Sequence, residues 1–289
     1  MAVADLDLRY YVDWSGLEDF DYNFDENGIP RVDYGQPIGL KYNAITISQW
    51  GLFNLQNFQQ EGDESAKFRA QQCAEWLVDH AHPWDHDSLA WIYEFGFDLY
   101  GPYPPWISGM AQGEAVSLLL RCVQLFQENE YIRVAHSAIK PFYYSFKEGG
   151  VSHTLADGLF FQEYPTNPPV HVLNGGIFAL FGLYDYARYF EAETAMNLAQ
   201  TCVDTLETHW RNWDVGYWTR YDLYPFVRLA SPMYQELHVR QFRAVARLFD
   251  RPTFNDVANR WKRQLHHPLN KSLWFGHKLY EKTRLALRR

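Results

Sequence analysis

The chain has 289 residues, 47% of them hydrophobic, and a formal net charge of −9 at pH 7. This content suits one large buried core, and no apolar run approaches the roughly 20 residues of a membrane span. Cys73, Cys122 and Cys202 lie far apart, so we expect buried thiols rather than a disulfide framework or a zinc site.

The charge is unevenly distributed along the chain. Residues 240–289 contain 13 Lys/Arg and 3 Asp/Glu, a local charge of +10 that leaves −19 for the remainder. Such a segment either attracts a polyanion or forms the solvated face of outer helices. No nucleic-acid-binding motif accompanies it, so we expect no nucleic-acid partner. Residues 1–7 are acidic and lack a signal-peptide pattern, which predicts a cytoplasmic location.

Helical segments recur along most of the chain. Residues 1–41 are acidic, aromatic and rich in glycine and proline, and we expect them to form a separate extended or β arm. Four segments that are apolar nearly all round, as inner helices should be, then follow at intervals of 67, 64 and 63 residues: 42–53, 109–126, 173–190 and 236–249. An amphipathic outer helix is expected after each of them: 66–80, 132–146, 194–210 and 253–266.

Between the helix pairs, aromatic and polar residues alternate and are bounded by glycine and proline, which predicts β-hairpins at 89–103, 151–164 and 215–224. The sequence therefore predicts a mainly α fold. We expect an incomplete (α/α) toroid or barrel over 42–289, with β-hairpins over the mouth of the cleft and a short N-terminal arm at 1–41.

Three short motifs interrupt aromatic segments with small or polar residues and then open apolar helices: WISGMAQG at 106–113, EYPT at 163–166 and LNG at 173–175. A loop that enters a helix in this way presents free N–H groups to a ligand. Flat aromatic rings suit the C–H faces of sugars, and tyrosine hydroxyls can bond to sugar oxygens. Most aromatic residues must fill the core, and the cleft candidates are those in interrupted motifs: Tyr42, Trp106, Tyr164, Tyr221 and Tyr234.

The order of these motifs, continued by GLYD at 182–185, YDL at 221–223 and a tyrosine four residues before His238, resembles the catalytic domain of the D-glucuronyl C5-epimerase family. The resemblance extends from about Tyr34 to Trp261. Members of this family invert glucuronate to iduronate in heparan-type polysaccharides, so it implies an isomerase with an anionic polysaccharide substrate and without a cofactor. Its animal members are dimers, which makes a homodimer a further expectation. The His and Asp residues at 79–87 are possible metal ligands, but Pro83 breaks their geometry and they stand at the end of an outer helix, so we expect no metal site.

The resemblance also implies site residues. It places four residues around the reacting sugar: Glu163, Tyr164, Tyr221 and Tyr234. The arginine that the family carries three residues after the YDL tyrosine is Tyr224 here, so we expect carboxylate recognition at Arg228 or Arg240, with His238 adding to the positive field. The candidates for substrate binding are Tyr42, Trp106, Ser108, Gly109, Met110, Ala111, Asn174, Phe178, Arg228, His238 and Arg240.

Inversion at C5 requires a base on one face of the sugar and an acid on the other. A neutral tyrosine donates a proton, and one whose pKa of about 10 is lowered by cationic neighbours accepts one. Other functions stay open. A polysaccharide lyase shares the proton abstraction, a toroidal glycoside hydrolase would pair Glu163 with Asp222 or Glu236, and an inactive sugar-binding module would use only the cleft. Each candidate also has a structural alternative as a packing residue.

Overall fold

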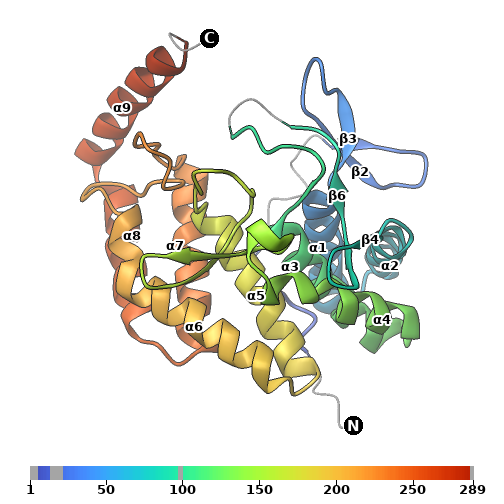
Figure 1. Ribbon diagram of the computed structural model, residues 1–289. Helices are drawn as coiled ribbons and strands as arrows, with labels where there is room; N and C mark the ends of the chain where they lie inside the picture. The colour runs from blue at the N-terminus through green and yellow to red at the C-terminus, as the bar shows by residue number, and fades with distance from the viewer. Residues whose placement is uncertain (1–5, 14–21, 97–99, 287–289) are drawn as a thin grey trace.

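The computed structural model describes residues 6–13, 22–96 and 100–286, with side chains through residue 284. It is mainly helical with small antiparallel sheets, as expected (Figure 1). The α-helices of this part of the chain are α1 (Ala44–Glu61), α2 (Glu64–Asp79), α3 (Gly109–Phe126), α4 (Asn129–Ala138), α5 (Leu173–Tyr189), α6 (Glu193–His209), α7 (Pro232–Leu248), α8 (Thr253–His266) and α9 (Pro268–Ala286). The strands are β1 (Asn23–Phe24), β2 (Pro30–Asp33), β3 (Leu40–Tyr42), β4 (His82–Trp84), β5 (Ser88–Ala90), β6 (Ile92–Tyr93), β7 (Trp106–Ile107), β8 (Ser152–Leu155) and β9 (Gly158–Phe161). None of the described helices is both long and apolar enough to cross a membrane.

The predicted alternation of inner and outer helices is observed, but the outer helix predicted at 132–146 is shorter: α4 ends at Ala138, and a 3-10 turn that contains Pro141 follows it. The helices α1, α3, α5 and α7 pack in succession, and each packs against the helix that follows it in the chain. Both α3 and α5 are buried along almost their whole length, because residues that are apolar on every face leave no side for solvent. The outer helices α2, α6 and α8 each bury one face and expose charged residues on the other. Residues near the starts of α1, α3, α5 and α7 line one cavity, so these inner helices begin at the same end of the molecule.

Two glycines allow the closest approach between inner helices. A Cβ atom added to Gly182 of α5 would lie 2.1 Å from the carbonyl oxygen of Gly113 in α3. A Cβ atom added to Gly113 would in turn lie 2.7 Å from the Cα atom of Ala179. Both contacts are with the backbone, so a side chain cannot be accommodated by a change of rotamer.

Replacing Gly182 by alanine should therefore destabilise the protein by roughly 1–3 kcal/mol, because the added methyl group overpacks the α3–α5 contact. The measurement is the free energy of unfolding in urea. Gly276→Ala is the matched control, since Gly276 lies in α9 with no atom within 4 Å of its added Cβ. That control should be neutral or stabilising by up to about 1 kcal/mol. Equal effects of the two substitutions would contradict this description of the helix packing.

Residues 6–13 pack against the helical core. Tyr10 and Val12 are buried, and Tyr11 donates a hydrogen bond to the carboxylate of Asp185 in α5. Asp185 also forms a fully buried ion pair with Arg121 of α3, at 2.5 Å. The Arg121 guanidinium donates to the carbonyl oxygen of Asp7 at 2.9 Å. These contacts link the N-terminal segment to the inner helices α3 and α5. Loss of one partner of the ion pair would leave an uncompensated buried charge. The domain boundary at residue 41 stays a prediction.

Of the three predicted hairpins, one is confirmed, one differs in its strand pairing, and one is absent from the described residues. The β8–β9 hairpin lies within the predicted 151–164 range. In the 89–103 range, β6 pairs with β7, which lies beyond that range, and residues 97–99 are outside the described part of the chain. The third prediction is wrong, because 214–229 forms only isolated bridges. There the Thr219 N–H donates to the Gln235 side chain at 2.8 Å instead of to a partner strand.

The N-terminal arm contains strands, in line with the expected extended or β arm, whereas the helix at the C-terminal end was not predicted. The N-terminal arm contains a three-stranded antiparallel sheet, in which β2 lies between β1 and β3. At the other end, α9 projects away from the helical body (Figure 1). Its exposed face carries several apolar side chains, Leu269, Leu273, Phe275, Leu279 and Tyr280.

Candidate active site

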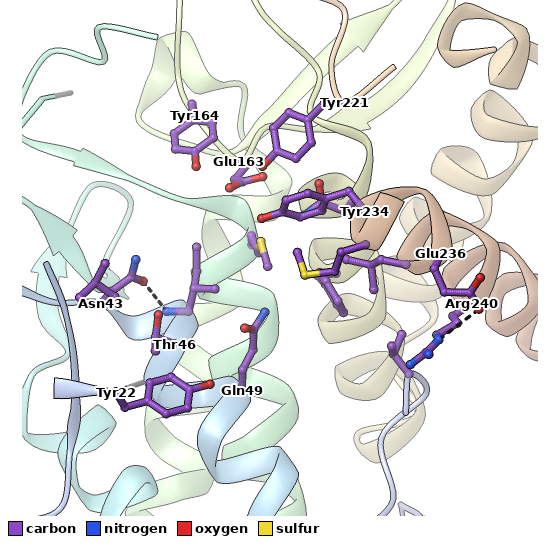
Figure 2. A pocket seen from close by; sticks show the side chains of 18 of the residues that line it. Tyr22, Asn43, Thr46, Gln49, Glu163, Tyr164, Tyr221, Tyr234, Glu236 and Arg240 are labelled. Carbon is purple, nitrogen blue, oxygen red and sulfur yellow. Dashed lines mark hydrogen bonds and ion pairs between the residues drawn. The ribbon is translucent and has the colours of Figure 1, made fainter. Parts of the chain in front are cut away.

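A cavity of about 930 Å³ opens between the N-terminal arm, α1, α3, α5 and α7. Figure 2 shows its two facing groups of side chains. One group comes from the segment after β9, the 221–229 loop and α7: Glu163, Tyr164, Tyr221 and Tyr234. The other comes from the arm and from α1: Tyr22, Asn43, Thr46 and Gln49. The cavity thus joins segments that lie far apart in the sequence.

Glu163 follows β9 and is held against the first turn of α5. A Cβ atom on Gly175 would lie 2.1 Å from Glu163 Oε2, so the glycine of the LNG motif makes room for this carboxyl group. Burial raises the pKa of Glu163 to about 7, and a hydrogen bond with Tyr164 offsets only part of this effect. Glu163 Oε2 is buried and has no hydrogen-bond partner among the described residues. A carboxyl group with these properties can gain and lose a proton near neutral pH.

Three tyrosines surround this carboxyl group. Tyr221 is fixed by its backbone, which accepts from the Leu173 N–H at 3.1 Å, and Tyr234 lies in the first turn of α7, capped by Ser231. The rings of Tyr221 and Tyr234 lie 4.8 Å apart. Burial, followed by the charge of Glu163, raises the pKa of both. The same two causes raise the pKa of Tyr164.

The expectation that cationic neighbours lower the pKa of these tyrosines is therefore wrong. The Arg228 guanidinium lies over the ring of Tyr221 at 5.9 Å, but burial still raises the pKa of this tyrosine. All three phenols stay neutral near pH 7, and a neutral phenol is a proton donor rather than a base. The arrangement pairs one carboxyl group of raised pKa with three hydroxyl donors.

Several of the predicted site residues line this cavity. They are Met110, Glu163, Tyr164, Asn174, Phe178, Tyr221, Tyr234 and Arg240. Asn174, at the start of α5, is buried, and its Oδ1 atom has no partner among the described residues. Its carbonyl oxygen accepts from Gln241 of α7 at 2.9 Å, which links the two inner helices at the cavity.

Other predicted residues support the cavity from behind or lie elsewhere. Trp106 donates to the carbonyl oxygen of Phe95 at 2.7 Å and stacks on Tyr93. Ser108 caps α3, and Ala111 is fully buried in that helix. Tyr42 lines a different, smaller depression, where its hydroxyl donates to Asp25 at 2.7 Å.

Gly109 has a different neighbour from the one expected. We expected it to allow a sugar to approach the backbone, but its N–H donates to the carbonyl oxygen of Gln162 at 2.9 Å. A Cβ atom there would lie 2.6 Å from that oxygen. A larger residue would therefore disturb the packing of α3 on the segment after β9. A loss of substrate binding in such a variant would not show that Gly109 contacts the sugar.

Arg228 and His238 do not provide the expected positive field. Arg228 is paired with the buried carboxylate of Asp222 at 2.7 Å, and Tyr100 donates to the same carboxylate at 2.5 Å. The Tyr100 ring stacks on Tyr164, so this network positions the site from outside the cavity. Burial lowers the pKa of His238 to about 3, so it is neutral, and its Nδ1 lies 3.1 Å from Thr219 Oγ1.

The motifs did not indicate that the arm and the polar face of α1 line the cavity. Asn43, Thr46 and Gln49 are spaced three residues apart and therefore share one face of α1. That spacing within a helix expected to be apolar all round was the available signal. Gln49 donates from Nε2 to the buried carboxyl of Glu114 at 3.1 and 3.2 Å. The contribution of Asn23, Arg31 and Asp33 depends on how the arm folds over α1, which no local pattern gives.

Comparisons with known proteins agree with the motifs. A family model described as "D-glucuronyl C5-epimerase C-terminus" matches residues 85–263. A D-glucuronyl C5-epimerase of Caenorhabditis elegans is 29% identical over 175 residues, 55% of this chain and 28% of that protein. An uncharacterized protein of Methanocaldococcus jannaschii is 25% identical over 138 residues, 46% of this chain and 45% of that protein. The chain thus spans less than half the length of either relative.

A likeness among solved structures concerns the fold alone. A solved structure of UGL with the saccharide dGlcA-Glc-Rha-Glc aligns with a TM-score of 0.52 at 14% identity. The alignment covers 76% of this chain and 61% of that one. The order of helix pairs, the motifs that meet at the cavity and the family match over 85–263 lead to one conclusion: this chain belongs to the D-glucuronyl C5-epimerase C-terminal domain family.

Proposed function

We propose that this protein is a uronate C5-epimerase that acts on glucuronate and iduronate residues of a heparosan-like polysaccharide. The observation that carries the proposal is Glu163, a buried carboxyl group of raised pKa that shares its cavity with Tyr164, Tyr221 and Tyr234. In the part of the chain that the structure describes, its Oε2 atom has no hydrogen-bond partner. The cavity would be the cleft of an open (α/α) toroid with hairpins near its mouth, and its volume suits a saccharide.

The proposed reaction begins with proton abstraction. The C5–H bond lies next to the uronate carboxylate, so loss of the proton leaves an enolate-like dianion that needs hydrogen-bond donors. Glu163 in its ionised form takes the proton from one face of C5, and Tyr164 holds its carboxylate by a hydrogen bond. A base whose pKa lies near the working pH is both available and strong enough to act.

The proposed reaction ends with reprotonation from the other face. Tyr221 and Tyr234, which share a hydrogen bond, supply a neutral phenol that donates a proton to C5 and becomes a phenolate. Glu163 is then protonated, and transfer of its proton back to the phenolate through solvent restores the starting state. In the reverse direction the two groups exchange roles, as microscopic reversibility requires.

A polysaccharide lyase is the nearest alternative, because it shares the abstraction but then expels the C4 oxygen. With a glucuronate polymer, we expect iduronate to form while absorbance at the unsaturated-uronate band stays at the level of the blank. The measurement is sugar analysis after incubation, with absorbance followed in parallel. A rise in absorbance with loss of chain length would show elimination instead.

A glycoside hydrolase is a weaker alternative. Its second carboxyl group would have to be Asp222 or Glu236, and Asp222 is committed to Arg228 and Tyr100 outside the cavity. Glu236 lines the cavity but pairs with Arg240 at 3.5 Å. New reducing ends without an unsaturated product would identify hydrolysis. Binding without any chemical change would identify an inactive sugar-binding module.

A further inference from the structure

The C-terminal helix α9 is attached to the body of the protein by one side. Trp274 donates from Nε1 to a backbone carbonyl oxygen of the 227–230 segment at 2.8 Å, and His277 Nε2 lies 3.1 Å from another. Glu281 is buried on the same side, 3.9 Å from the guanidinium of Arg228. The three α9 residues are spaced three and four positions apart, so they share one side of the helix. These contacts hold α9 in a fixed orientation.

The side of α9 that faces away from the body is apolar. Its exposed side chains are Leu269, Leu273, Phe275, Leu279 and Tyr280, and we call this set the apolar face of α9. A surface helix normally turns such residues toward the core. Here the polar anchors face the body, and the helix projects from it (Figure 1). Contiguous exposed apolar side chains of this kind mark an interaction surface.

Positive charge borders the apolar face. Lys271 and Lys282 of α9 are both exposed. The only carboxylate in α9 is that of Glu281, which is buried and lies 2.9 Å from Lys278. No acidic side chain of the helix is therefore left to offset the two exposed lysines. The wider segment 240–289 carries +10, against −19 for the rest of the chain. The partner of this face should combine apolar groups with negative charge.

An anionic lipid surface has this combination of properties. Helices that lie in the interface of a bilayer bury Leu and aromatic side chains below the headgroups and place lysines beside the lipid phosphates. A second copy of this chain fits less well, because a two-fold interface sets the same patch against itself and would bring lysines together. Lysine is also depleted in protein–protein interfaces. A water-soluble polyanion would satisfy the lysines and leave the apolar side chains exposed.

We propose that the apolar face of α9 binds the surface of bilayers that contain anionic phospholipid. Phe275 and Leu279 enter the boundary between headgroups and acyl chains, and Lys271 and Lys282 face the phosphates. The acidic remainder of the chain is repelled by the same surface, so that attachment through α9 fixes the orientation of the protein. Because α9 is anchored to the 227–230 segment, which adjoins Tyr221, the attachment holds the candidate active site close to the membrane.

Sedimentation with lipid vesicles tests the proposal. The full chain is incubated with vesicles of phosphatidylcholine alone, or of phosphatidylcholine mixed with the anionic lipid phosphatidylglycerol. We expect binding to the mixed vesicles to be roughly tenfold tighter or more, since each lysine near an anionic surface contributes about fivefold. The affinity should fall as salt is added, because screening acts over about 8 Å at physiological ionic strength. Equal binding to both kinds of vesicle, or no binding to the anionic ones, would overturn the proposal.

Substitutions locate the lipid-binding surface. Changing both Phe275 and Leu279 to serine should weaken binding to the mixed vesicles by roughly tenfold or more, because it removes two apolar side chains from the interface. Phe68→Ser on α2 is the matched control, since Phe68 and Phe275 are 59% and 60% exposed, and it should bind as the wild type does. Lys271→Ala should weaken binding by about fivefold on the anionic vesicles only.

The oligomeric state distinguishes a lipid surface from a second copy of the chain. Light scattering should show the same mass for the wild type and for the variant with both serine substitutions. A wild-type dimer that becomes a monomer in this variant would show that a second copy covers the apolar face, and would overturn the proposal. Unchanged affinity of the same variant for the anionic vesicles would overturn it as well.

Discussion

Glu163→Gln should reduce epimerase activity by roughly 10²–10⁴-fold or more while making the folded protein more stable at pH 8. The loss of activity follows because glutamine cannot accept the C5 proton, and loss of a general base typically has this effect. The gain in stability follows from burial, because an ionised carboxyl group in this environment is held at a cost that the neutral amide avoids. Functional sites commonly trade stability for activity in this way.

The sign and the pH range follow from the pKa of Glu163. In the folded protein it is about 7, above the ordinary value of 4.5. As the pH rises above about 4.5, the unfolded chain loses this proton first, so the folded state becomes less stable until about pH 7. The difference between the two values corresponds to roughly 3 kcal/mol at most. Glu163→Gln should therefore match the wild type near pH 4.5 and exceed it by up to this amount at pH 8.

Urea unfolding at the two pH values provides the measurement. Glu207→Gln serves as the control, because Glu207 is partly exposed and its loss should give no comparable gain at pH 8. A Glu163→Gln protein that is active would remove Glu163 as the base. A variant that is inactive and equally destabilised at both pH values would indicate a structural role for the carboxyl group.

Tyr234→Phe and Tyr164→Phe should separate the two faces of the reaction. Each change retains the ring packing and deletes one hydroxyl group. Loss of a proton donor typically lowers the rate by roughly 10²–10⁴-fold. In Tyr234→Phe, Glu163 can still remove the proton from one epimer, so solvent deuterium should enter that epimer without inversion. In Tyr164→Phe, the carboxylate loses its hydrogen-bond partner, so exchange from the same epimer should slow.

The control for the tyrosine pair is Tyr186→Phe, whose hydroxyl lies 2.8 Å from His136 Nδ1, outside the cavity lining. It should retain full activity. Full activity in Tyr234→Phe and in Tyr221→Phe would reject a phenol as the acid on the second face. If Tyr234→Phe has a normal free energy of unfolding but exchanges no deuterium into either epimer, the Tyr234 hydroxyl lies on the same face of the sugar as Glu163.

The parts of the fold and the site that the sequence could predict are those encoded by local patterns. The inner helices at 109–126 and 173–189 are buried on every side, so their composition alone identifies them. Glu163, Tyr164 and Asn174 stand where a hairpin ends or an inner helix begins, and the ring of helices brings such points together. The family motifs supplied their order, and the cavity contains all three residues.

The errors concern long-range partners. Arg228 has the charge to bind the carboxylate of a substrate, but in the fold it pairs with the carboxylate of Asp222. The sequence alone does not show which of these two carboxylates the arginine binds. His238 is neutral because the folded core surrounds it, which its position near a helix start does not disclose. Asn23 and Arg31 reach the cavity because β2 lies over α1, a placement fixed by tertiary packing of the arm.

The most direct test of the epimerase proposal is deuterium exchange at C5. The wild-type protein is incubated in D₂O with an unsulfated glucuronate polymer, and the label is located by NMR. We expect deuterium at C5 of both glucuronate and iduronate, with kcat/KM rising about tenfold per pH unit below about pH 7 and level above it, as an ionised Glu163 requires. A polymer that binds in the cavity but retains its C5 protons across this pH range would contradict the proposed function.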